Sequence, residues 1–230
     1  MTIQRRALKI CLERVQMNSY ELIMKDIKAT ISKYLECKMI VNPLFAEKKC
    51  NDFSISSNHN QTGIQKDAKF SEVYQNICNQ NDYLFMFNDG GVIQIDYKFY
   101  MKSISEACLI YYPCPNELMY DGYLDKMKTY IRLEYTEDRT QYSAVSHTKA
   151  HIHIGNYNDL RIGVKRVPTL SEFMELIMYL NYHEDWIKIK NVTSEDELIK
   201  MVEDIIRERK EMTVQGCLES YEEQFFSITL

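Results

Sequence analysis

The middle of the chain alternates apolar and polar residues, and this pattern predicts a series of β-strands. We expect an apolar strand at 83–87 and alternating strands at 92–99, 103–112, 128–135, 149–154 and 160–164. A period of two places every second side chain on the same face of a sheet. Between the first two strands stands Asn88-Asp89-Gly90-Gly91, and these residue types tolerate the positive φ values of tight turns. The sequence therefore predicts a hairpin here.

Helical spacing of apolar residues appears at both ends of the chain. Residues 2–38 predict two helices, the second capped by Asn18 or Ser19 and burying Leu22, Ile23, Ile27, Ile31 and Leu35. We also expect a short helix from Ser71 to Cys78, one opening at Thr169 or Ser171, and one from the capping box Ser194–Glu197 to about Met212. Residues 41–69 predict loops, with a short strand at Phe53–Ser56.

Helices, then a meander of strands, then helices are typical of an α+β domain. We expect an antiparallel sheet of about six strands flanked by N-terminal and C-terminal helices. The predicted organisation is a single domain over 1–230, with a helical N-terminal part at 1–80, the sheet at 81–165 and a helical C-terminal part at 166–230. The 230 residues are enough for a substantial core.

Composition and charge narrow the classes of function. The formal net charge is −5, which argues against a broad basic surface for nucleic acid but leaves room for a local positive cleft. No apolar run is long enough to span a membrane, and the start shows no signal region, so we expect a cytoplasmic protein without a membrane partner. The seven cysteines include no CxxC pair and are expected to be reduced. Most of the 17 tyrosines are expected to fill the core.

The strand at 149–154 concentrates the titratable chemistry of the chain. His147, His151 and His153 are three of the five histidines. The alternation puts His151 and His153 on one face of the strand, while its apolar residues face the other way. If the neighbouring strands form a meander, this face also carries Arg132 and Glu134 from the strand before and Arg161 from the strand after. These side chains would then converge with the imidazoles, because opposed residues of antiparallel strands lie about 5 Å apart at Cβ.

The ordinary interpretation of such residues is a solvated sheet face with cross-strand ion pairs. Two functional interpretations compete with it. In the first, His147, His151 and His153 with Glu134 form the catalytic group, the imidazoles transfer protons without a cofactor, and Arg132 and Arg161 bind the phosphate of a substrate. In the second, one divalent transition metal is bound by His147, His151 and His153, with Glu134 as a fourth ligand or as a base.

Several motifs in this region resemble a bacterial family known as domain of unknown function 2290. They are Asn88-Asp89-Gly90-Gly91, Tyr112-Pro113-Cys114-Pro115, Arg132-Leu133-Glu134-Tyr135, and His147 with His151-Ile152-His153-Ile154-Gly155 and Arg161-Ile162. The resemblance spans about residues 70 to 185. The family pattern has Asp where this chain has Glu134, and Pro where it has Gly163.

The resemblance implies the context of mobile elements, antiviral defence or toxin–antitoxin modules. The sequence therefore supports two hypotheses. The protein is a phosphodiester-cleaving, RNase-like component of a bacterial defence or toxin-like module, with RNA or a nucleotide as substrate. Alternatively, it is a non-catalytic subunit whose Tyr-rich sheet binds a protein partner in a defence or toxin–antitoxin complex.

Overall fold

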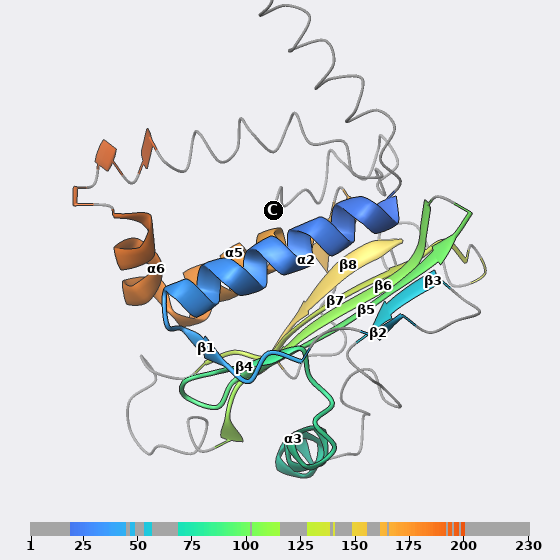
Figure 1. Ribbon diagram of the computed structural model, residues 1–230, viewed down its shortest axis with the longest axis horizontal. Helices are drawn as coiled ribbons and strands as arrows, with labels where there is room; N and C mark the ends of the chain where they lie inside the picture. Colours follow the sequence, from blue (N-terminus) through green and yellow to red (C-terminus); the bar gives the residue numbers. More distant parts are fainter. Residues whose placement is uncertain are drawn as a thin grey trace, which may run out of the picture.

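The computed structural model describes residues 19–44, 47–48, 53–56, 69–101, 103–115, 128–138, 140, 149–155, 162–164, 166–191, 193–194, 196–197 and 199–200. Within these residues the protein is α+β, as predicted (Figure 1). The predicted first helix within 2–18, the link at 116–126 and the tail beyond residue 200 lie outside the described residues.

One antiparallel sheet runs through the described part of the chain. Its main path contains β1 (Ile40–Val41), β4 (Phe85–Phe87), β5 (Val92–Tyr100), β6 (Ser103–Tyr112), β7 (Ile131–Thr136), β8 (Ala150–Ile154) and β9 (Ile162–Gly163), in that order. Strand β3 (Phe53–Ser56) pairs with β5 and with β2 (Glu47–Lys48). From β4 to β9 each strand pairs with the next, so the predicted meander is confirmed.

Two helices cover one face of the sheet (Figure 1). They are α2 (Ser19–Glu36) and α5 (Leu170–Asn181), and α6 (His183–Lys190) follows α5 directly. The sheet contributes to this core with every second residue, including Ile93, Ile95, Leu109, Leu133 and Ile152. The Asp26 carboxylate of α2 accepts hydrogen bonds from the backbone N–H and the hydroxyl of Ser171 at the start of α5. This pair fixes the two helices to each other.

The opposite face is divided into an apolar and a polar part. Helix α3 (Phe70–Asn79) packs against one end of it, where Ile77 meets Val92, Ile110 and Tyr112 in a second buried cluster. The strand pattern predicted one apolar face and one polar face, and α3 buries part of the second. The polar side chains of β5 to β8 therefore lie beyond α3, at the other end of the sheet.

The turn between β4 and β5 is the predicted tight hairpin. Phe85 pairs with Ile93, and Gly90 has φ 91°, a conformation that glycine adopts easily. Gly91 is required for a different reason, because a Cβ atom there would lie 2.9 Å from the Tyr182 hydroxyl. The Asp89 carboxylate accepts hydrogen bonds from the Gly91 N–H and from that same hydroxyl. The turn is thus attached to the junction of α5 and α6.

Several helix predictions hold in outline and differ in detail. Helix α5 opens at Thr169 through a capping box with Glu172, one of the two predicted starts. Helix α3 begins at Phe70, and its N-cap residue Lys69 makes no side-chain bond, so the predicted Ser71 cap is wrong. Strands β1 and β2 and helix α6 were not predicted. They are short, and short elements give too few residues for a period to show.

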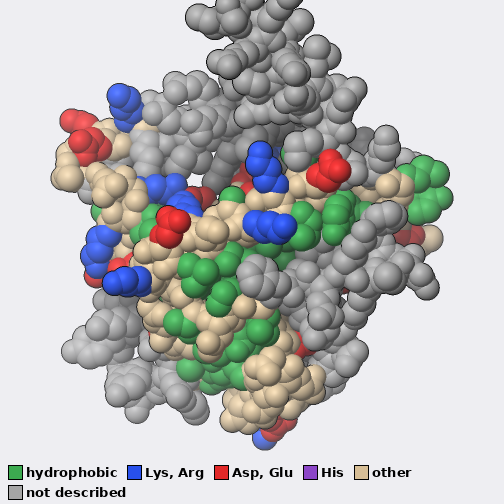
Figure 2. All heavy atoms as spheres, viewed as in Figure 1, with side chains coloured by type: hydrophobic (Ala, Val, Ile, Leu, Met, Phe, Trp, Pro, Cys, Tyr) green, Lys and Arg blue, Asp and Glu red, His purple; other side chains and the backbone are tan. Residues whose placement is uncertain are grey.

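Two residues of α2 that the sequence pattern places in the core are exposed to solvent. Leu22 and Leu35 are 37% and 40% exposed, whereas Thr30 and Tyr34 are buried. Along this face lysines and acidic residues lie side by side, and no histidine is visible among the coloured residues (Figure 2). None of the described helices combines the length and the apolar composition that crossing a membrane demands.

Candidate functional site

Strands β7 and β8 bring four polar side chains together on the sheet face opposite α2 and α5. In their antiparallel register, Arg132 pairs with His153 and Glu134 pairs with His151. The intervening residues of both strands point into the core between the sheet and the helices. The period of two therefore does what the sequence predicted: it separates an apolar face from a face that carries the imidazoles.

These side chains converge on a single carboxylate oxygen. Oε2 of Glu134 lies 3.3 Å from Nε2 of His153 and 3.5 Å from Nε2 of His151. A guanidinium nitrogen of Arg132 is 3.5 Å from the same oxygen. The two imidazole rings are 4.8 Å apart between centroids and nearly perpendicular, at 67°. We call Glu134, His151 and His153 the β7–β8 cluster.

The cluster is largely removed from water. His151 and His153 are 3% and 1% exposed, while the Glu134 side chain is 34% exposed. Neither ring nitrogen of His153 forms a hydrogen bond among the described residues, and the contact of Nε2 with Glu134, at 3.3 Å, is an ion-pair contact. Nε of Arg132 is in the same situation. Buried polar groups without partners are uncommon and costly in folded proteins.

The groups around Glu134 and His153 set their protonation states. Burial alone would raise the pKa of the Glu134 carboxyl, but the two histidines and the Arg132 charge outweigh it and hold this pKa well below its usual value. Burial lowers the pKa of His153, and the nearby Arg132 charge lowers it further, against the opposing effect of Glu134. An ionised carboxylate therefore lies beside a neutral imidazole near neutral pH.

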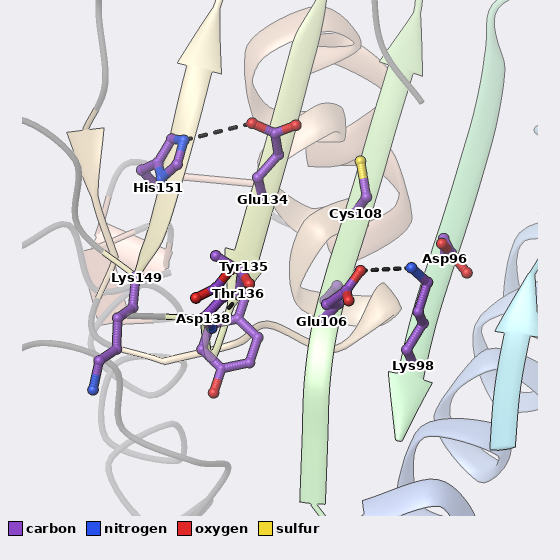
Figure 3. Close-up of a pocket in the computed structure, with 11 residues that line it drawn as sticks. Asp96, Lys98, Glu106, Cys108, Glu134, Tyr135, Thr136, Asp138, Lys149 and His151 are labelled. Carbon is purple, nitrogen blue, oxygen red and sulfur yellow. Dashed lines mark hydrogen bonds and ion pairs between the residues drawn. The ribbon is translucent and has the colours of Figure 1, made fainter. Parts of the chain in front are cut away.

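A cleft of about 290 Å³ adjoins the cluster on the same sheet face. Glu134 and His151 form part of its wall, next to Cys108 and Asp96 (Figure 3). These four residues lie in one row across the sheet, since Asp96 pairs with Cys108, Cys108 with Glu134 and Glu134 with His151. The cluster is thus reached from the cleft at its Glu134 and His151 side, and His153 is not among the residues that line the cleft.

Acidic side chains outnumber basic ones in this cleft. The charged residues that line it are Asp96, Glu106, Glu134, Asp138, Lys98 and Lys149. The Lys98 ammonium is 2.6 Å from the Glu106 carboxylate and lies in an exposed ion pair (Figure 3). Four carboxylates against two lysines give the lining an excess of negative charge. An anionic substrate would need further positive charge here.

The structure brings together four of the six predicted site residues: Arg132, Glu134, His151 and His153. His147 and Arg161 lie outside the described residues, so their placement stays a prediction. Sequence reasoning did not single out Asp96 and Cys108, which share the row with Glu134. Their strands are separated from the histidine strand in sequence, and only the sheet register shows that they are neighbours.

A comparison with protein families finds the family that the sequence motifs resemble. The chain belongs to the family described as "Uncharacterized conserved protein (DUF2290)". The family match covers residues 37–215, a wider span than the region of about 70 to 185 in which the motifs stand. It includes the sheet from β1 to β9, the β7–β8 cluster and the helices α3, α5 and α6 of this DUF2290 protein. No curated protein and no solved structure matches the chain.

Proposed function

We propose that the β7–β8 cluster is an active site for phosphodiester cleavage, with RNA as the substrate. The observation that supports this most strongly is the shared carboxylate: two imidazoles and a guanidinium contact Oε2 of Glu134 beside a cleft. Proton transfer and stabilisation of a phosphoryl group both use this set of side chains. A defence or toxin-like context rests on the family resemblance alone and stays a prediction.

The positions of the residues suggest a division of roles. Glu134 and His151 line the cleft, so they are the groups that would activate a nucleophile. His153 lies behind them, and the charge of Arg132 favours the ionised form of Glu134. The predicted contact between Arg132 and a phosphate stays a prediction, as does that of Arg161.

Two routes of activation lead to different products. If an imidazole takes the proton of the RNA 2′-hydroxyl, O2′ attacks phosphorus and the P–O5′ bond breaks. The O5′ atom then gains a proton, which leaves a 2′,3′-cyclic phosphate and a 5′-hydroxyl end, and DNA is not cut. If an activated water attacks instead, one of the P–O bonds is hydrolysed, no cyclic phosphate forms, and DNA can also be cut.

The test uses the full-length protein with labelled RNA and DNA of the same sequence. We expect cleavage of RNA by the wild type and a loss of at least about 100-fold in the His151→Ala/His153→Ala double variant, since a positioned acid or base contributes about 10²–10⁴-fold. His183→Ala is the matched control, because His183 is exposed on α6 and stacks on Trp186 away from the cluster. Equal rates for the double variant and the wild type would remove this proposal.

The binding-subunit hypothesis gains little from the sheet tyrosines. Tyr97, Tyr111, Tyr112 and Tyr135 of the sheet and Tyr130 just before β7 are all buried. These five fill the core and the α3 side of the sheet, which leaves Tyr100, 65% exposed at the end of β5, as the exposed tyrosine of the described strands. Binding of a protein partner elsewhere on the molecule stays a prediction.

A further inference from the structure

We propose that Glu134, His151 and His153 bind one divalent transition metal ion, of the Zn²⁺ class, at the wall of the cleft. The inference deepens the proposed function by naming what activates the nucleophile, and only its consequence for cleavage rests on that function. Binding of the ion itself rests on the geometry of the three donors.

The distances between the donor atoms suit a small metal ion. In a tetrahedral zinc site with bonds of 2.0–2.2 Å, two ligand atoms are about 3.4 Å apart. Oε2 of Glu134 lies 3.3 Å from Nε2 of His153 and 3.5 Å from Nε2 of His151. One ligand atom from each of the three residues can be chosen so that all three lie within 4.8 Å of one another. Small rotations of the imidazole rings would bring the two histidines to bonding distance from the same ion.

The chemical types of the donors point in the same direction. Two imidazoles and one carboxylate are the protein ligands of many catalytic zinc sites, in which water or substrate occupies the fourth position. Here Glu134 and His151 border the cleft, so the fourth position would open toward it. The strand positions support a chelate, because His151 and His153 project from the same face of β8.

A purely structural role for the cluster leaves one feature unexplained. His153 is 1% exposed, yet neither of its ring nitrogens has a hydrogen-bond partner among the described residues. A buried polar group without a partner is costly, because it has lost its hydrogen bonds to water. A metal ion bound to Nε2 would supply the missing partner.

The charge of the cleft gives an independent reason. Its lining holds four carboxylates and two lysines, and the Arg132 charge beside Glu134 offsets only part of this excess. A divalent cation beside Glu134 would balance that excess and let an anionic phosphodiester approach. The same ion would bind a water molecule and lower its pKa, which makes hydroxide available as the nucleophile. The attacking oxygen would then come from water, and the RNA 2′-hydroxyl would not be needed.

Arg132 is the feature that opposes metal binding most directly. Its guanidinium lies 3.5 Å from Oε2 of Glu134 and would repel a cation there. The guanidinium contacts Oε2 of Glu134 only as an ion pair, and Nε of Arg132 makes no hydrogen bond among the described residues. We therefore expect Arg132 to turn from Glu134 toward the cleft or toward the substrate when the ion binds. Arg132→Gln should then bind Zn²⁺ more tightly than the wild type.

The test is calorimetric titration of the full-length, tag-free, metal-free protein with Zn²⁺. We expect one ion per chain and an affinity at least about 100-fold lower in Glu134→Gln and His153→Gln, since even the outer-shell partners of a metal site are worth about 10–100-fold. Both substitutions keep the size of the side chain approximately, and circular dichroism shows whether the variants fold. His183→Ala is the matched control and should bind like the wild type.

Two further measurements keep the outcomes distinguishable. Zn²⁺ should raise the melting temperature of the wild type but not of Glu134→Gln, because only the folded state holds the site. Zn²⁺ binding with no defined number of ions per chain would overturn the inference. A loss of affinity in His183→Ala as large as in Glu134→Gln and His153→Gln would overturn it as well. If Zn²⁺ binds as expected and neither RNA nor DNA is cut, the inference stands and the proposed function fails. If no Zn²⁺ binds and cleavage persists in chelator with a 2′,3′-cyclic phosphate product, the proposed function stands and the inference fails.

Discussion

Glu134 contacts His153 although the two residues are not paired in the sheet. The register places Glu134 opposite His151 and Arg132 opposite His153, yet Oε2 of Glu134 lies 3.3 Å from Nε2 of His153. The carboxylate thus reaches one partner directly across the strands and the other along the diagonal. This reach gathers two imidazoles around one oxygen, and it is the basis of the proposals made above.

Neutralising Glu134 should destabilise the metal-free protein. In Glu134→Gln the side chain of Arg132, which is 13% exposed, loses its carboxylate partner. We expect the free energy of unfolding to fall by about 1–3 kcal/mol, the range for removing one partner of a largely buried polar group. Urea unfolding at neutral pH measures this difference.

Glu106→Gln provides the comparison for that measurement. Glu106 lies on the neighbouring strand β6 and pairs with Lys98, and both side chains are about half exposed. Exposed ion pairs contribute about 0–1 kcal/mol, so this variant should unfold nearly like the wild type. Equal losses in both variants would mean that the β7–β8 cluster adds no stability of its own.

Adding a methyl group at position 91 should strain the β4–β5 turn. A Cβ atom there would lie 2.9 Å from the Tyr182 hydroxyl and 3.0 Å from the Tyr111 ring. We expect Gly91→Ala to lower the free energy of unfolding by about 1–3 kcal/mol, as overpacking of a core typically does. Chemical denaturation measures it, and the Tyr182→Phe background shows the cause, because removal of the hydroxyl should make Gly91→Ala less costly. An unchanged cost in that background would place the strain elsewhere.

Glu175 should make the stability of the protein sensitive to acid. Burial opposes its charge, but hydrogen bonds from Lys190 and Trp186 and the charge of Lys33 outweigh this and lower its pKa below the usual 4.5. A lowered pKa means that the folded state favours the ionised form, so this contribution is complete above pH 4.5 and is lost as the pH falls through the lower, folded-state pKa. Unfolding curves should be measured from about pH 6 to about pH 3, on both sides of the usual carboxyl pKa. Over this range the free energy of unfolding should fall less steeply in Glu175→Gln than in the wild type. A decline as steep as in the wild type would contradict the prediction.

The thiols of Cys37 and Cys108 should differ in reactivity. Cys37 is exposed after α2. Burial raises the pKa of the Cys108 thiol well above its usual value, and the neighbouring Glu134 carboxylate adds to the effect. Because the thiolate is the reactive form, we expect iodoacetamide to modify Cys37 first and Cys108, whose thiol lines the cleft, much more slowly. Mass spectrometry of the peptides that contain the two residues follows this, and early labelling of Cys108 would show that the cleft is more open than the structure indicates.

Much of the fold could be predicted because it follows from local patterns. The period of two in β5 to β8 predicts which residues point into the core, and the Asn88–Gly91 turn predicts the hairpin. The capping box at Thr169 marks the start of α5. Short elements escaped prediction, since the two residues of β1 contain no period, and α6 follows α5 after the single residue Tyr182.

What the sequence by itself determined is the face on which each strand residue lies. That is why Glu134, His151 and His153 could be predicted to share a surface, since side-chain alternation is a property of the local backbone. Only the tertiary structure decided which of these residues meet. The register joins Asp96 and Cys108 to the row of Glu134, and α3 covers one end of the same sheet face and leaves the other end as a cleft. Such contacts depend on the pairing and packing of distant segments, which no local pattern of residues encodes.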